Sequence, residues 1–107
     1  MSNITISGTW ETRRVRINGK YLSPIPSQKI LNHSPDGFNW SYGGSGPAQL
    51  ALAILLTQTD ESTALYLHQY FKWDVVAKLP KSDFEISLDI RDYIHKKFNE
   101  RKTEVSC

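Results

Sequence analysis

The sequence has only one cysteine and no long apolar run. Cys107 is the last of 107 residues, so no disulfide can form within the chain, which excludes the disulfide-stapled scaffolds of secreted proteins. The longest apolar run, 50–56, is far shorter than the roughly 20 residues that cross a bilayer, and the polar start lacks a signal-peptide pattern. We therefore expect one cytoplasmic domain over residues 1–107, with about the last six residues flexible.

Net charge is also small. Thirteen basic and eleven acidic residues leave +2, which is too little to indicate nucleic-acid binding by itself. The charges are unevenly placed: residues 1–22 hold four basic residues and one acid, whereas residues 60–90 hold six acids and three lysines. Arg14 and Arg16 belong to the basic segment. We interpret them as a solvated strand face, and direct nucleic-acid binding is an alternative that we do not favour.

The N-terminal segment alternates between apolar and polar side chains, as β-strands do. Asn18-Gly19 is typical of a type I′ hairpin turn, because both central residues of that turn need positive φ. We expect strands at about 4–10, 12–17 and 20–23. Residues 23–46 hold three of the five prolines and four of the six glycines, which predicts a long irregular connection with a short strand near 38–42.

From Pro47 onward the spacing of apolar residues becomes helical. It predicts a first helix over 47–58, apolar on all sides and therefore buried. A second helix should begin at a cap provided by Asp60 or Ser62, end before Pro80 and expose Lys72. A short strand at 84–86 and a third helix over 88–100, capped by Ser87, complete the prediction. The expected fold is α+β: a small antiparallel sheet packed against about three α-helices.

The most unusual segment is 42–49, Tyr-Gly-Gly-Ser-Gly-Pro-Ala-Gln. Three glycines before a buried helix allow close approach of another group, and the N–H groups at a helix start can bind an anion. The segment lacks the Lys-Ser/Thr of a Walker A loop, the third glycine of the dinucleotide fingerprint and the last glycine of a nucleophile elbow. Two interpretations stay open, a tight strand-to-helix turn and a site for a phosphate or carboxylate.

The three histidines, His33, His68 and His95, are far apart in the sequence. None has metal-ligand spacing, so we expect no metal and no cofactor. His68 lies among apolar helical positions and is expected to pack half-buried. His33 lies in a polar turn and can act as an acid or base near pH 7. A hydrolase or transferase that uses His33 and Ser45 ranks last, because nothing in the sequence pairs a base with a nucleophile.

The stretch 32–55, Asn-His-Ser-Pro-Asp-Gly-Phe-Asn-Trp-Ser-Tyr-Gly-Gly-Ser-Gly-Pro-Ala-Gln-Leu-Ala-Leu-Ala-Ile-Leu, resembles a family of small proteins of unknown function from bacteria, phages and archaeal viruses. The resemblance extends to 15–19, 71–80 and 86–90 and so covers most of the chain. Ser41 stands where this family's pattern has glycine. The resemblance implies a stand-alone small domain, often carried on mobile elements, whose signature is the glycine loop.

Our leading hypothesis is a non-enzymatic binding protein that holds an anionic small ligand, such as a nucleotide, at the glycine loop. It assigns charge neutralisation to Arg14 or Arg16 and stacking on a base to Trp40 or Tyr42. The alternative is a protein-interaction module, such as a viral anti-CRISPR inhibitor of a host-defence enzyme in the host cytoplasm. Self-association into a homodimer is a further hypothesis. The full set of candidate ligand-binding residues is Tyr42, Gly43, Gly44, Ser45, Gly46, Gln49, Trp40, His33, Arg14 and Arg16.

Overall fold

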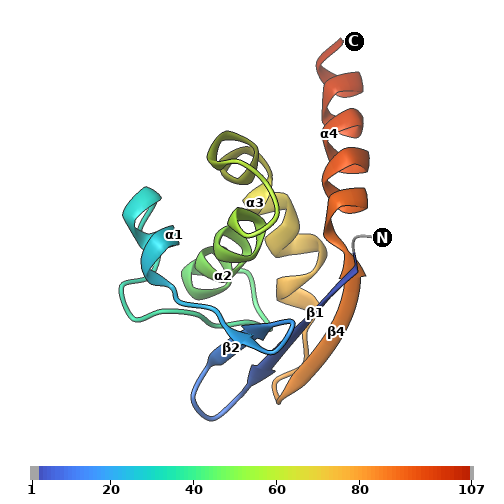
Figure 1. Ribbon diagram of the computed structural model, residues 1–107. Coiled ribbons are helices and arrows are strands. Elements are labelled where there is room, and N and C mark those ends of the chain that lie inside the picture. Colours follow the sequence, from blue (N-terminus) through green and yellow to red (C-terminus); the bar gives the residue numbers. More distant parts are fainter. Residues whose placement is uncertain (1–2, 107) are drawn as a thin grey trace.

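Four antiparallel strands and the helices on one face of their sheet make an α+β fold, as expected (Figure 1). The computed structural model describes residues 3–106, with side chains described for residues 3–100. The elements are β1 (Asn3–Thr9), β2 (Arg14–Ile17), β3 (Lys20–Tyr21), α1 (Ile25–Ile30), α2 (Ser45–Leu56), α3 (Glu61–Asp74), the 3₁₀ helix η1 (Val76–Lys78), β4 (Phe84–Asp89) and α4 (Ile90–Ser106). Cys107 lies outside the described residues, and flexibility of the last six residues stays a prediction.

The sheet has the strand order β3-β2-β1-β4, with β1 in its centre. Gly8 of β1 lies opposite Val15 of β2 on one side and opposite Phe84 of β4 on the other. Asn18 and Gly19 have φ values of 51° and 81°, so the turn between β2 and β3 has the two positive φ angles of a type I′ hairpin. The predicted N-terminal strands therefore match β1, β2 and β3 to within a few residues.

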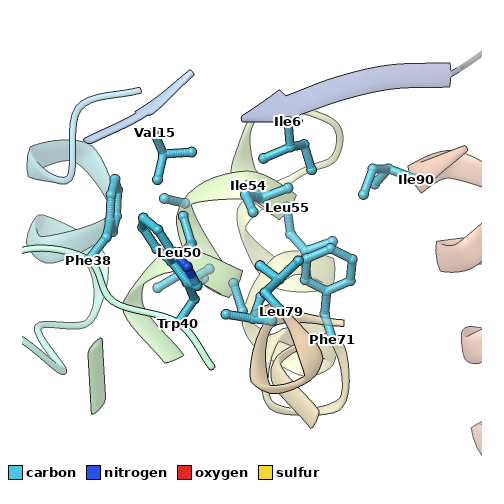
Figure 2. Close-up of a cluster of buried hydrophobic side chains, with 14 of the residues drawn as sticks. Ile6, Val15, Phe38, Trp40, Leu50, Ile54, Leu55, Phe71, Leu79 and Ile90 are labelled. Atoms are coloured by element: carbon cyan, nitrogen blue, oxygen red, sulfur yellow. The ribbon is translucent and has the colours of Figure 1, made fainter. Parts of the chain in front are cut away.

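The core lies between the sheet and the helices α2 and α3. Residues 46–55 of α2 are all buried, which confirms that this predominantly apolar helix is central and buried on several sides. Burying one large apolar side chain stabilises a fold by about 1.5–3 kcal/mol, so this helix is a main source of stability. The core side chains labelled in Figure 2 are Ile6, Val15, Phe38, Trp40, Leu50, Ile54, Leu55, Phe71, Leu79 and Ile90.

The helix ends differ from the predicted ones for local reasons. α2 begins at Ser45, two residues early, because the missing N–H of Pro47 is tolerated anywhere in the first turn, where N–H groups have no intrahelical acceptor. α3 ends at Asp74 because Val75 leaves helical geometry, with φ −127° and ψ −61°. The 3₁₀ turn η1 follows and stops at Leu79, which is extended with φ −68° and ψ 152°. A residue before proline is disfavoured in helical geometry, and Pro80 follows Leu79.

The segment 23–46 differs from the prediction in two ways. It contains a short helix, α1, at Ile25–Ile30, and it has no strand near 38–42, where one was expected. The backbone N–H groups near residue 40 bind acceptors outside the sheet. The Trp40 N–H donates to Asn39 Oδ1 over 2.9 Å, and the Ser41 N–H donates to the Val76 carbonyl over 3.1 Å. The alternation of aromatic residues at 38, 40 and 42 therefore reflects anchoring of a loop, and the strand prediction was wrong.

α4 begins two residues later than predicted, and β4 runs three residues further. Asp89, not Ser87, is the residue before α4, and its Oδ1 accepts the N–H of Asp92 over 3.0 Å. Ser87 lies within β4, where its Oγ is 3.0 Å from the Thr5 Oγ1 of the neighbouring strand. α4 runs to Ser106 and extends away from the other helices (Figure 1). Within residues 3–106, no helix has both the length and the apolar character that a membrane span requires.

Candidate functional site

α2 starts at the glycine loop, here defined as residues 42–46. Gly44 is the cap residue in an extended conformation, and no side chain hydrogen-bonds the first turn. Ser45 and Gly46 are the first two helical residues, and Pro47 has no N–H. The N–H groups of the first turn have no intrahelical acceptor and lie at the positive end of the helix dipole. The backbone of this start therefore has the polarity that attracts an anion.

Two aromatic rings pack directly on the backbone of this loop. A Cβ atom added to Gly43 would lie 2.0 Å from the ring of Trp73, and one added to Gly44 would lie 2.4 Å from the ring of Tyr42. A side chain at either position would have to displace one of these rings, so both glycines let the rings lie on the backbone, which gives the turn interpretation a physical basis. The two side chains nevertheless keep 48% (Tyr42) and 56% (Trp73) of their surface exposed, so their rings flank the loop on the surface.

Gly46 and Ser41 fix the path of the backbone around the loop. A Cβ atom on Gly46 would lie 2.6 Å from the Cβ of Asn39 and 3.2 Å from its backbone nitrogen, which cannot move independently. Ser41 has a φ of 84°, in the left-handed region that costs a residue with a Cβ roughly 1–2 kcal/mol. Glycine adopts this conformation without that cost.

Lys72 is a buried cation beside the glycine loop. It is 7% exposed, its Nζ donates to the Gly43 carbonyl over 3.0 Å, and Nζ lies 4.5 Å from the ring centroid of Trp73. Among the residues with described side chains, no carboxylate lies within 4.0 Å of this ammonium. The prediction that Lys72 faces solvent was wrong, because this face of α3 turns toward the loop.

Gln49 joins α2 to the segment 27–34. Its Oε1 accepts the N–H groups of His33 and Ser34 over 2.7 and 2.9 Å, and its Nε2 donates to the Ser27 hydroxyl and the Leu31 carbonyl over 2.9 and 3.2 Å. A glutamine amide has two donors and two acceptor lone pairs, so all its capacity is used inside the fold. Gln49 therefore positions the turn at His33, and it has no group left for a ligand.

His33 and His68, expected to be unrelated, form a hydrogen-bonded pair. Their Nε2 atoms are 2.9 Å apart and their ring centroids 5.0 Å, so the rings meet head-on. His68 Nδ1 lies 2.8 Å from the Leu65 carbonyl, which can only accept, so Nδ1 carries hydrogen. In the neutral pair, His68 Nε2 therefore accepts a hydrogen bond from His33 Nε2–H. Within the described residues, no group of three or more His, Cys, Asp or Glu side chains could hold a metal ion.

Both histidines are held toward the neutral form. Burial lowers the pKa of His68, and the neighbouring charges of His33 and Lys72 lower it further, against hydrogen bonds to the backbone that raise it. Burial lowers the pKa of His33 as well, with Lys72 adding to the effect. His68 and Lys72 are four residues apart on α3, so the histidine pair and the buried ammonium lie on one side of that helix.

The remaining predicted site residues lie elsewhere. Trp40 is 0% exposed, makes edge contacts with Trp10 and Phe84, and donates its Nε1–H to the Ser82 carbonyl, so its ring cannot stack on a ligand. Arg14 lines a small pocket of about 170 Å³ that contains no residue of the glycine loop. Arg16 is on the exposed face of the sheet. Neither arginine makes a hydrogen bond or ion pair with residues 42–46 within the described part of the chain.

A family model matches residues 7–96 of this chain, which is most of its length. It describes a family of unknown function, DUF6166. The chain belongs to this family. The match includes the whole glycine loop, both histidines of the pair and Lys72. Neither a curated protein nor a solved structure matches the chain.

Lys72, Trp73 and His68 were missed as site residues because each looks ordinary on a helix. His68 and Lys72 are separated by four residues, which places them on one face of α3, and that spacing was the available signal. The sequence could not show that this face meets the glycine loop, because contacts between elements depend on the tertiary fold. The third hypothesis, a hydrolase or transferase that uses His33 and Ser45, stays a prediction: His33 Nε2 contacts His68, and the described residues show no hydrogen bond from His33 to Ser45.

Proposed function

We propose that this protein binds an anionic small ligand at the glycine loop, where α2 begins. The observation that carries the proposal is Lys72, a buried ammonium that contacts the Gly43 carbonyl and has no carboxylate partner among the described side chains. Taking an ammonium out of water costs several kcal/mol, and one carbonyl and one ring face offset only part of that cost. A phosphate or carboxylate at the helix start would supply the missing counter-charge.

The exposed rings beside the loop favour a ligand with a planar group. Tyr42 and Trp73 lie next to Gly44 and Gly43, and they are the aromatic side chains that solvent reaches there. Base–aromatic stacking contributes roughly 1–3 kcal/mol per base. We therefore propose a nucleotide, with its phosphate at the start of α2 and its base against Trp73 or Tyr42. Trp40, Arg14 and Arg16 have no part in this version of the site.

The test is a comparison of three probes, with thermal unfolding and titration calorimetry as readouts. ATP carries both groups, tripolyphosphate has no base, and adenosine has no phosphate. A ligand that binds only the folded state stabilises it by RT ln(1 + [L]/Kd). We expect ATP to raise the midpoint at millimolar concentration, tripolyphosphate to raise it less, and adenosine to have little effect. No stabilisation by either anion, from a folded protein, would overturn the proposal.

Lys72→Met is the decisive variant, with Lys78→Met as its control. An apolar side chain of similar volume avoids the cost of burying an ammonium without a carboxylate, and this gain offsets the lost hydrogen bond to the Gly43 carbonyl. We therefore expect Lys72→Met to keep or raise the unfolding midpoint of the ligand-free protein while weakening ATP binding at least ~10-fold, a loss of about 1.4 kcal/mol. Lys78 is exposed on η1, so its replacement should leave both quantities unchanged. Equal ATP affinity in the two variants would exclude Lys72 from the site.

A protein-interaction module remains the second candidate, and one observation favours it. Tyr66 of α3 and Phe98 of α4 are large, exposed and in contact, with ring centroids 5.4 Å apart. Exposed aromatic residues are the typical anchors of protein interfaces. A viral inhibitor of a host-defence enzyme would use such anchors. Under this candidate, the double variant Tyr66→Ala/Phe98→Ala loses a defined host partner, Lys72→Met retains it, and no anion stabilises the protein.

A further inference from the structure

One face of the sheet has no helix on it. Ile6, Val15 and Phe84 point to the helices and are buried, and successive strand residues point to opposite faces, so their neighbours point the other way. Figure 1 shows α1, α2 and α3 on the same side of the strands, while α4 continues beyond the end of β4. We call the uncovered side the outer face. Its residues are Asn3, Thr5, Ser7, Thr9, Arg14, Arg16, Tyr21, Glu85, Ser87 and Asp89.

Charges on the outer face are separated by sign. Ser7 of the central strand lies opposite Arg16 of β2 on one side and opposite Glu85 of β4 on the other, and Tyr21 pairs with Arg16 at the far edge. The two charged residues are two strand spacings apart, about 10 Å, which is too far for a direct ion pair. Among the described side chains, neither has an ion-pair partner. The face therefore carries a positive side and a negative side with small residues between them.

We propose that the outer face packs against the outer face of a second copy of this chain, about a twofold axis nearly parallel to β1. Such an axis exchanges the two sides of the sheet, so Arg16 lies against Glu85 of the partner subunit and Glu85 lies against Arg16 of the partner subunit. Ser7 lies at the axis, where its small side chain lets the sheets approach to the usual spacing of about 10 Å. A twofold contact of this kind is self-complementary and closed.

The charge pattern favours a second copy of this chain as the partner, and it favours a twofold axis parallel to β1. A twofold axis perpendicular to the strands would place β2 against the β2 of the other copy and so bring arginines together. A nucleic acid would meet two arginines on one side but Glu85 on the other, with Asp83 two residues before it, and these carboxylates repel phosphates. A second copy in the arrangement proposed here is the partner that neutralises both sides at once.

The size of the face sets the expected strength of the contact. Six residues of strand at about 3.3 Å each and the width of three strands give a patch of roughly 20 by 15 Å on each copy, which is smaller than a standard interface and typical of weak, transient contacts. We therefore expect a weak dimer that forms at tens of micromolar concentration. Because its contacts are exposed ion pairs, its dissociation constant should rise several-fold between ~50 mM and ~500 mM salt.

Sedimentation analysis of charge-reversal variants tests the proposal. In Arg16→Glu, the new carboxylate faces Glu85 of the partner subunit, and in Glu85→Arg the new guanidinium faces Arg16 of the partner subunit. We expect each variant alone to dissociate at least ~10-fold more readily than the unaltered protein. A mixture of the two restores opposite charges at both contacts, so it should form a heterodimer. The double variant in one chain should form a homodimer again.

Arg91→Glu, which reverses an exposed arginine on α4, is the matched control and should dimerise normally. Circular dichroism confirms that each variant is folded, and the salt dependence of the unaltered protein needs no variant at all. A monomer at ~100 µM in low salt overturns the proposal. So does a dimer that persists in both single variants, or a mixture that fails to associate. Separation of the mixture by a tag on one variant identifies the heterodimer directly.

Discussion

Gln49 shows, at the scale of one residue, how a polar side chain in the core can define a loop. Its four hydrogen bonds hold Ser27, Leu31 and the turn at His33–Ser34 against α2. We expect Gln49→Leu to lower the free energy of unfolding by about 2–4 kcal/mol, because it leaves two N–H groups and a carbonyl without partners. Urea denaturation measures this change.

Gln69→Leu is the matched control, because Gln69 is exposed on α3 and its replacement should change the free energy of unfolding by less than ~0.5 kcal/mol. A similar small effect for Gln49→Leu would mean that the turn at His33 holds without its anchor. The sequence marked Gln49 as a candidate for ligand binding, since it ends the glycine-loop motif. Only the three-dimensional contacts show that its amide is already satisfied.

At the scale of elements, the His33–His68 pair fastens the loop before the glycine loop to α3. In the neutral pair, the two rings share one hydrogen bond between their Nε2 atoms. If both rings were protonated, two Nε2–H groups would point at each other close to the Lys72 ammonium. Lys72 is the charged group that acts on the pair, and Gln49 on α2 is uncharged. The folded state therefore resists protonation at this contact more than the unfolded chain does.

This contact predicts that stability falls in mild acid. The pKa values of both histidines are lowered from 6.5 in the folded protein, so the unfolded state binds more protons below that pH. The contribution of the pair is complete above about pH 6.5 and is lost as the pH falls toward the folded-state pKa values. Urea midpoints measured from pH 8 to pH 5 should fall more steeply for the unaltered protein than for His33→Asn.

The slope of the urea midpoint against pH is the informative quantity, because His33→Asn also removes a hydrogen bond and so lowers stability at every pH. His95→Asn, on the exposed side of α4, should retain the slope of the unaltered protein. An unchanged slope in His33→Asn would assign the acid sensitivity to other groups.

Turns and helices that depend on neighbouring residues in the sequence were predictable, whereas contacts between distant elements were not. The Asn18-Gly19 turn and the all-apolar α2 follow from local conformation and composition, and both formed as expected. α1 was missed because two prolines suggested an irregular loop, although proline is tolerated at the start of a helix. The pairing of His33 with His68 joins residues 35 positions apart, and no local pattern encodes such a contact.

At the scale of the whole molecule, the two proposed surfaces face different ways. The glycine loop, Lys72 and Trp73 lie on the side of the helices, whereas Arg16 and Glu85 lie on the outer face of the sheet. The core of α2 and the sheet separates them (Figure 2). A ligand at the glycine loop can shift the monomer–dimer equilibrium only if it binds the monomer and the dimer with different affinity. The proposed ligand site does not touch the proposed dimer contact.

We therefore expect ligand binding and dimer formation to be independent. Calorimetry should give one ATP site per chain, with the same affinity in the unaltered protein and in Arg16→Glu, because dimer dissociation leaves the glycine loop intact. Sedimentation of Lys72→Met should give the dissociation constant of the unaltered dimer, with or without ATP. A change of more than ~3-fold in either quantity, about 0.7 kcal/mol, would mean that the sheet transmits strain from one face to the other.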